Sequence, residues 1–374
     1  MPAFYVNALL AWGTQMKFLF QCLVVLLVVS CGFGTNAPTT KNSPDDAALP
    51  LPQPLQNFSA ASPSITIMTW NVENLYDAED DPQKLDDTYL PLQIKKQIPN
   101  HFKDCKKLDA KSWQEQCAEW DWNESVVSEK LRRLGQVIRA VNSGAGPDFL
   151  ALQEVENIQL LQRLIDEQLP NMNYKAYLIE NNDARGIDVG VITRLPIAEA
   201  PKLIPLGKSR PALKLNVELP DKNKMSITVV HFPIASSPLK KRLGMLSKIT
   251  SQSGENLQLI LGDFNFPRDE MQGSEIAKTL LLPKWVPMHL YCTSCQGSTY
   301  ETFTGDWSFL DMILVNEAFF SAHTPWTVNV NSFRLHNPLP FQTNRYGSPA
   351  DFTLPSMRGV SDHWPLVIQL FKTP

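Results

Sequence analysis

Residues 65–71 of the chain read Ile-Thr-Ile-Met-Thr-Trp-Asn. Apolar and polar side chains largely alternate here and β-branched residues are frequent, which is typical of a β-strand. The run stops at Asn71, a residue type that favours turns over strand interiors. We therefore predict a strand over residues 65–70 whose end presents the side chain of Asn71.

Similar apolar runs recur further along the chain. They predict strands over residues 149–152, 187–193, 212–218, 226–231, 257–261, 309–315 and 365–371. Apolar residues at helical spacing predict three helices, from residue 127 to about 141, over 158–169 and over 239–250. Consecutive strands mixed with helices favour a mixed sheet or two packed sheets over a regular alternation of strand and helix.

The composition narrows the class of protein. Hydrophobic residues make up 43% of the chain and charged residues 19%, which is typical of a soluble globular protein and excludes one with many membrane spans. The net charge of -4 excludes a strongly basic protein that coats duplex nucleic acid. We find no second linker and no repeat after residue 64, so we predict one monomeric domain over residues 64–374, with a polar insertion at about 76–123.

The N-terminal segment predicts export. Residues 18–29 form an apolar run of the length of a signal-peptide core, and Val-Val-Ser-Cys follows at 28–31. This ending resembles a bacterial lipoprotein cleavage box with the lipid on Cys31; the alternative is an ordinary signal peptide that contains a cysteine. Residues 32–63 are rich in Pro, Ser and Asn and predict a flexible tether. We expect a protein of the bacterial cell envelope, held at a membrane through Cys31, or a secreted one.

Four cysteines lie beyond the predicted signal peptide: Cys105, Cys117, Cys292 and Cys295. In an oxidising compartment, two disulfides between the cysteines nearest in sequence are the simplest arrangement. The spacing of Cys292 and Cys295 also suits half of a zinc site or a redox pair. No second pair stands at matching spacing, so we favour structural disulfides.

Polar residues suited to hard cations and phosphate nearly all stand next to the predicted strands. Taken one at a time, such residues usually serve turns. Strand ends can also present side chains to one common cleft. The residues concerned are Asn71, Glu154, His231, Asp263, Asn265, Asp311, Asp362 and His363.

The segments around these residues resemble the endonuclease/exonuclease/phosphatase superfamily of metal-dependent phosphoesterases. In the family's order they are TWNVENL at 69–75, LQEV at 152–155, VHFP at 230–233, GDFN at 262–265, FLD at 309–311 and SDHWP at 361–365. The resemblance spans residues 65–371. It implies an α/β fold, a four-layer α/β/β/α sandwich of two packed mixed sheets with the active site at one rim.

The resemblance also implies a metal and a set of ligands. Carboxylate and amide oxygens are the ligands that Mg²⁺ prefers, and Mn²⁺ is the alternative ion. We predict Glu154 as the principal metal ligand, assisted by Asn71 and Asp362. Asp263 is predicted to deprotonate the attacking water, and Asn265 to hold water or a phosphate oxygen.

The remaining predicted roles concern the phosphate. His363, oriented by Asp311, is predicted to donate to the phosphate as its charge grows. His231 is predicted to contact a second phosphate oxygen or to protonate the leaving group. Arg185 is predicted to approach the phosphate, the alternative being a hairpin stabilised by a pair between Arg185 and Asp188. We interpret Arg210 as a surface residue.

Two segments bear on the substrate. The insertion interleaves basic and aromatic residues, as surfaces for single-stranded nucleic acid do, but we favour a solvated lysine face with tryptophans packed around a disulfide. Its residues of these kinds are Lys95, Lys96, Lys103, Lys106, Lys107, Lys111, Trp113, Trp120 and Trp122. Residues 316–360 form a long loop-rich stretch that we expect to line the cleft.

We therefore expect an endonuclease-like phosphodiesterase that hydrolyses nucleic acid. The first alternative is a family member acting on phosphomonoesters, inositol phosphates or phospholipid headgroups. The second is a non-catalytic surface binding protein, which would have lost site residues that this chain keeps.

Overall fold

The computed structural model describes residues 51–55, 62–181, 183–252, 256–273, 281 and 284–373. The predicted signal peptide and Cys31 lie outside the described residues. None of the helices in the described ranges is both long enough and apolar enough to cross a membrane.

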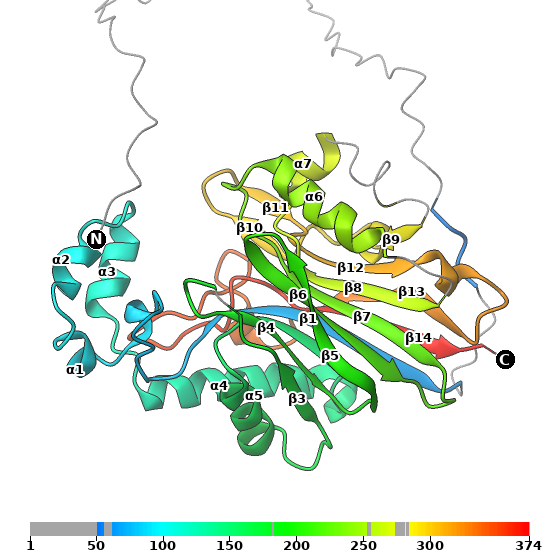
Figure 1. The fold of residues 1–374 in the computed structure, drawn as a ribbon, viewed down its shortest axis with the longest axis horizontal. Helices are drawn as coiled ribbons and strands as arrows, with labels where there is room; N and C mark the ends of the chain where they lie inside the picture. The colour runs from blue at the N-terminus through cyan, green and yellow to red at the C-terminus, as the bar shows by residue number, and fades with distance from the viewer. Residues whose placement is uncertain are drawn as a thin grey trace, which may run out of the picture. The chain divides into compact units, whose positions relative to one another are not determined.

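Two six-stranded mixed sheets form the centre of the fold (Figure 1). The first sheet has the order β13-β14-β1-β2-β4-β3 and the second the order β5-β6-β7-β8-β12-β9. The strands of the first sheet are β1 (Ser64–Leu75), β2 (Phe149–Val155), β3 (Lys175–Leu178), β4 (Asp188–Thr193), β13 (Trp326–Leu335) and β14 (Leu366–Lys372). The strands of the second sheet are β5 (Ile197–Leu206), β6 (Ser209–Glu218), β7 (Lys224–His231), β8 (Leu257–Asp263), β9 (Trp285–Pro287) and β12 (Asp311–Asn316). A separate hairpin consists of β10 (Thr299–Glu301) and β11 (Asp306–Ser308).

Successive side chains of a strand point to opposite faces of its sheet, and both faces of each sheet are apolar. On β1, Ile65 and Ile67 pack in the core between the sheets, whereas Met68 and Trp70 pack in a second core on the outer face. Helices α4 (Glu124–Ala140) and α5 (Ile158–Arg163) cover that outer face, and α6 (Leu239–Thr250) covers the outer face of the second sheet (Figure 1). The predicted four-layer α/β/β/α sandwich is therefore confirmed.

Strand pairing brings the polar strand ends to one rim. β1 runs parallel to β2, and Asn71 stands opposite Gln153. β7 runs parallel to β8, and His231 stands opposite Asp263. β12 pairs antiparallel with β8, so its first residue, Asp311, also stands opposite Asp263. The carboxyl ends of both parallel pairs and the start of β12 thus meet where the motifs stand.

The predicted helices are present with adjusted bounds. The helix predicted over residues 239–250 is α6. The helix predicted from residue 127 begins at Glu124, because the Asn123 side chain accepts hydrogen bonds from the backbone N–H groups of Ser125 and Val126. The helix predicted over residues 158–169 is α5, continued by one π-helical turn, Leu164–Gln168. A further short helix, α7 (Arg268–Gly273), follows β8.

Six strands were not predicted: β3, β5, β9, β10, β11 and β13. β9, β10 and β11 have three residues each, too few to show a pattern. β3 and β5 are edge strands with few fully buried residues, so their sequences lack a clear apolar face. β13 lies inside the stretch 316–360 that we expected to be loop-rich, so that prediction is wrong over Trp326–Leu335.

The insertion forms short helices fastened by a disulfide. These are α1 (Leu92–Lys95), α2 (His101–Cys105) and α3 (Lys111–Glu119), and the Cys105–Cys117 bond joins the last two. Cys292 and Cys295 form the other disulfide, so both predicted pairs are confirmed. Both interpretations of the insertion place Lys95 at the surface, and both are wrong at this residue. Its side chain is buried, and Nζ donates to the carbonyls of Thr88, Cys117 and Trp120 at 2.8, 3.1 and 2.7 Å.

The end of the predicted tether packs on the domain. Leu51 lies against the core between the sheets, and the Tyr291 hydroxyl donates to the Pro52 carbonyl at 2.7 Å. The backbone N–H of Lys372 donates to the Pro63 carbonyl at 2.9 Å. The predicted tether boundary at residue 63 is therefore too late for the described residues among 51–63.

Gly262 is required where β7 and β8 approach. Its φ is +134°, and a Cβ there would lie 2.0 Å from the Val230 carbonyl oxygen. We expect Gly262→Ala to lower the free energy of unfolding by about 3 kcal/mol, from backbone strain and steric overlap together. Chemical denaturation measures this loss. Gly244→Ala on α6 is the control, since its Cβ would meet nothing within 4 Å and helix propensity favours Ala; equal stability of the two variants would contradict this prediction.

Candidate active site

Asn71 links the two sheets at the rim. Its side-chain Nδ2 donates to Asp263 Oδ2 at 3.1 Å and lies 3.4 Å from Glu154 Oε1. Its Oδ1 accepts from the backbone N–H of Glu73 at 3.0 Å, at the point where the pairing of β1 with β2 is interrupted before it resumes at Leu75. One amide thus touches a residue of each sheet.

A bulge directs Glu154 into the same place. The pairing of β2 with β1 and β4 is irregular around Glu154, and its φ is +64°, a conformation that costs energy for a residue with a side chain. Its Oε2 accepts from the backbone N–H of Asn74 at 3.0 Å. Strain of this kind is typical of functional sites.

Asp263 is a buried carboxylate held from both sides. Its Oδ1 accepts from the backbone N–H of Asn265 at 2.8 Å, and its Oδ2 accepts from Asn71. Burial, followed by the nearby Asp311 carboxylate, raises the pKa of Asp263 to about 7. A carboxylate with such a pKa can take up a proton near neutral pH. The Asn265 Nδ2 donates to the Phe232 carbonyl at 2.9 Å, so this amide group is already engaged.

His363 and Asp311 form a buried pair. His363 Nδ1 lies 2.7 Å from Asp311 Oδ2. Burial alone would lower the pKa of His363, but the carboxylates of Asp311 and Asp362 outweigh it and hold the pKa well above the usual value. Asp311 is fully buried behind the imidazole, so it positions His363. The Ser361 hydroxyl, which accepts from the His363 backbone N–H at 3.0 Å and donates to the Asn71 carbonyl at 2.7 Å, fixes the same turn.

His231 is a neutral donor. A guanidinium N–H of Arg210 contacts His231 Nδ1, and because a guanidinium can only donate, Nδ1 accepts and the ring proton sits on Nε2. Burial first, and then Arg210 and Arg185, lower the pKa of His231 well below the usual value. Nε2 lies 3.7 Å from both Glu154 Oε1 and Asp263 Oδ2.

The two arginines lie beside these groups. Arg185 Nη2 is 3.8 Å from Glu154 Oε2 and also contacts the side chain of Asn74. Asp188 contacts Asn181, so the alternative pair between Arg185 and Asp188 is absent from the described contacts. Our surface interpretation of Arg210 is wrong. Its side chain is 12% exposed and pairs with Asp183 at 3.1 Å while it contacts His231.

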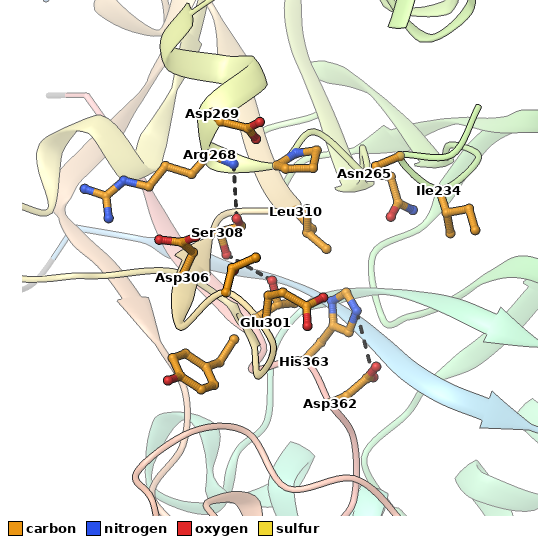
Figure 2. A pocket seen from close by; sticks show the side chains of 15 residues that line it. Ile234, Asn265, Arg268, Asp269, Glu301, Asp306, Ser308, Leu310, Asp362 and His363 are labelled. Carbon is orange, nitrogen blue, oxygen red and sulfur yellow. Dashed lines mark hydrogen bonds and ion pairs between the residues drawn. The ribbon is translucent and has the colours of Figure 1, made fainter. Parts of the chain in front are cut away.

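Asp362 completes the group at the solvent side. Its Oδ1 is 3.8 Å from His363 Nε2, and about half of its side chain is exposed (52%). Figure 2 shows Asp362 and His363 next to each other on the wall of a hollow that Asn265 also lines. The predicted site residues therefore come together at one rim: Asn71, Glu154, Arg185, His231, Asp263, Asn265, Asp311, Asp362 and His363.

Lys130 is a supporting residue that the sequence analysis missed. It is fully buried on α4, and its Nζ donates to the carbonyls of Glu73 at 2.9 Å and Val360 at 2.7 Å. These carbonyls lie two residues from Asn71 and from Asp362, so one ammonium group joins both segments. The sequence held a signal, since Lys130 stands next to Leu131 on the apolar face of the helix between Val127 and Leu134.

The donor set fits a hard divalent cation. Glu154 and Asp362 offer carboxylates, which are ligands suited to Mg²⁺ and Mn²⁺. The Asn71 amide turns its Nδ2 toward Glu154 and Asp263, so its oxygen would reach a cation only after the side chain rotates. Although half of its side chain is exposed, the protein atoms around the Asp362 carboxylate, and then the Glu154 carboxylate, raise its pKa to about 6. The two carboxylates therefore oppose each other's charge. A bound cation would relieve this repulsion.

Comparison with models of protein families shows which family the chain belongs to. Residues 68–363, most of the chain, match the model of the Endonuclease/Exonuclease/phosphatase family. The chain belongs to this family. It is therefore a phosphoester hydrolase of a family that depends on divalent metals. Comparison with curated proteins gives no match.

Solved structures share the fold. A D. rerio TDP2 complexed with a single strand DNA product matches with a TM-score of 0.51 and 14% identity, over 82% of this chain and 98% of that one. A family member from Bacteroides thetaiotaomicron matches with a TM-score of 0.50 and 12% identity, over 84% of this chain and 100% of that one. At such identities the likeness concerns the fold alone.

Proposed function

We propose that the chain is an exported, endonuclease-like phosphodiesterase that cleaves nucleic acid with Mg²⁺ or Mn²⁺. The observation that carries the proposal is that two separate hollows border the reactive side chains. One hollow, the His363 hollow, includes Asn265, Asp362 and His363 in its lining. The other, the His231 hollow, includes Arg210 and His231.

Two hollows suit a diester better than a monoester. A phosphodiester carries a substituent on each side of the phosphorus atom, and each substituent needs space beyond the reactive groups. A monoester needs space on one side. The His231 hollow also includes Lys208 and Ser209, which offer an ammonium and a hydroxyl group to a neighbouring phosphate, whereas Arg210 in the same lining is already paired with Asp183.

The residues divide the chemistry of hydrolysis among them. Asp263 accepts a proton from the attacking water, for which its raised pKa suits it. His363, protonated through its pair with Asp311, donates a hydrogen bond to a phosphate oxygen as negative charge develops there. His231 donates through Nε2–H to a second oxygen, and because it is neutral we favour this role over protonation of the leaving group.

A cation held by Glu154, Asn71 and Asp362 would polarise the phosphate and neutralise its charge. Arg185, beside Glu154, adds a positive charge next to these carboxylates. We further propose export through residues 1–31, with a lipid anchor on Cys31, and a monomeric enzyme; the neighbouring TDP2 structure with a DNA product makes single-stranded DNA the first substrate to test.

A substrate comparison tests the proposal. The purified chain is incubated with single-stranded DNA, duplex DNA, RNA and p-nitrophenyl phosphate, with Mg²⁺, Mn²⁺ or EDTA. We expect internal cleavage of a nucleic acid with either metal and none with EDTA. Turnover of p-nitrophenyl phosphate without cleavage of any nucleic acid would overturn the nuclease proposal in favour of a phosphomonoesterase.

The proposal also predicts a pH profile. In the metal-free protein the pKa of Asp263 is raised to about 7, and a nearby cation lowers it, so kcat/KM should rise with pH along a limb that lies at or below about pH 7. The pKa of His363 is raised well above its usual value, so His363 stays protonated through this range. Loss of its proton should lower the rate only at higher, alkaline pH. Initial rates between pH 5 and 9 at saturating metal measure both limbs. A rate that falls between pH 6 and 8 would contradict the assignment of Asp263 as the base.

A further inference from the structure

A second acidic group lies in the insertion, apart from the active-site residues. Residues 77–87 read Asp-Ala-Glu-Asp-Asp-Pro-Gln-Lys-Leu-Asp-Asp, and we call them the acidic loop. Asp80, Asp86 and Asp87 each place one carboxylate oxygen within 4.8 Å of the other two. Three like charges at this spacing repel one another unless a cation or protons intervene.

Asp86 is the buried member of this group. It is 1% exposed, and its Oδ1 has no hydrogen-bond partner among the described residues, while its Oδ2 accepts from the backbone N–H of Asp81 at 3.2 Å. A buried carboxylate oxygen without a partner is costly, because it has lost its water and gained nothing in return. Burial, with the neighbouring Asp80 and Asp81 carboxylates, raises the pKa of Asp86 to about 6.

Nearby cationic side chains do not balance the charge. Lys84 belongs to the acidic loop, but its Nζ donates to the carbonyls of Asn181 at 3.3 Å and Asp183 at 2.9 Å. Within the described part of the chain, neither Asp80 nor Asp86 forms an ion pair with any cationic side chain. Asp87 has a weak partner, His101 Nδ1, at 3.3 Å.

We propose that Asp80, Asp86 and Asp87 bind a structural Ca²⁺ ion. Ca²⁺ takes six to eight oxygen ligands in flexible geometry and is commonly held by several carboxylates and carbonyls of one loop. Mg²⁺ demands octahedral geometry and usually takes one or two carboxylates. Three carboxylates from eight successive residues, one of them with an unpartnered oxygen, therefore fit Ca²⁺ better.

The acidic loop contacts the segment that leads to Arg185, so a bound ion would stabilise the position of that segment. The Leu85 backbone N–H donates to the Ala184 carbonyl at 2.7 Å, and Lys84 binds the carbonyls of Asn181 and Asp183. The acidic loop thus holds the segment that leads into Arg185, which lies beside Glu154. Binding of Ca²⁺ would fasten the acidic loop and this segment together, independently of the metal that serves hydrolysis.

Thermal unfolding of the EDTA-treated full chain tests the proposal. Adding millimolar Ca²⁺ should raise Tm by roughly 5 °C in the wild type. Glu154→Gln, which weakens the active-site metal, should keep this rise. Asp80→Asn should lose it, and Asp80 is exposed, so the variant should fold. Asp109→Asn, an exposed aspartate elsewhere in the insertion, is the matched control and should keep the rise.

Asp86→Asn should change Tm in opposite directions without and with Ca²⁺. Without Ca²⁺ it removes one of three repelling charges, so its Tm should equal or exceed that of the wild type. With Ca²⁺ it lacks a ligand, so its Tm should fall below that of the wild type. A variant that merely damages folding would lose Tm in both conditions.

Two results would overturn the proposal: no Ca²⁺-dependent rise in the wild type, or a full rise in Asp80→Asn. If the rise is kept in Asp80→Asn and lost in Glu154→Gln, the ion is at the active site. An equal rise with the same concentration of Mg²⁺ in Glu154→Gln would overturn the choice of Ca²⁺.

Discussion

Asp263→Asn is expected to lower kcat for phosphodiester hydrolysis by about 10³-fold, because it removes the group that takes the proton from water. The amide has nearly the shape of the carboxylate and keeps an oxygen for the Asn265 backbone N–H, but its NH2 group replaces the oxygen that accepts from Asn71, so a modest loss of stability should accompany the change. The folded protein should survive, since burial already disfavours the charged form of Asp263. Steady-state rates on the best substrate, with a thermal unfolding curve for each variant, measure both effects.

Asp269→Asn is the matched control for this change. Asp269 lines the His363 hollow and is exposed. Its loss should leave kcat within about twofold of the wild type, since no role in proton transfer falls to it. If Asp263→Asn kept near-full activity, another group would be the base and the proposed division of roles would be wrong.

His363→Ala is expected to lower kcat by a similar factor of about 10³, because it removes a charged donor to the developing negative charge. The change also leaves Asp311 buried without its 2.7 Å partner, so some loss of stability should accompany it. His363→Gln, which restores a neutral donor, should recover part of the stability and little of the rate. Rates and unfolding curves of the two variants separate charge from packing.

The exposed His323 supplies the control for this pair, and His323→Ala should match the wild type in rate and stability. Retention of most activity by His363→Ala would show that the transition-state charge is stabilised elsewhere, for example by Arg185 or His231.

Much of the sandwich could be predicted because its central strands carry a strong local signal. The runs that became β1, β2, β7 and β8 are apolar on both faces, since each sheet is covered by the other sheet and by helices. β5 lacks this signal because it is an edge strand with a largely exposed pattern. β13 was missed although apolar and polar residues alternate over Trp326–Asn331, because the stretch around it is rich in polar residues and proline.

The candidate site residues were found through motifs, but their supports were not. Lys130, Arg210 and Ser361 act through backbone carbonyls or through other side chains far away in sequence, and such contacts exist only once the sheets are paired. At Lys95 the sequence suggested a role that the structure does not show. Its place among other lysines suggests a basic surface, whereas three backbone carbonyls hold it inside the insertion.

The convergence of the motifs depends on register. Glu154 reaches Asn71 because a bulge interrupts β2, and Asp263 reaches Asn71 because the two sheets are packed face to face. A sequence motif specifies the residue type but neither the bulge nor the sheet packing. These features follow from the tertiary structure.

Anomalous diffraction from crystals soaked in Mn²⁺ would examine the metal site itself. We expect an anomalous peak in contact with Glu154 and near Asn71 and Asp362, and its loss in Glu154→Gln crystals treated in the same way. A Mn²⁺ peak elsewhere in the molecule, with none at Glu154 in crystals of the active enzyme, would contradict the proposal that these residues gather around a catalytic cation.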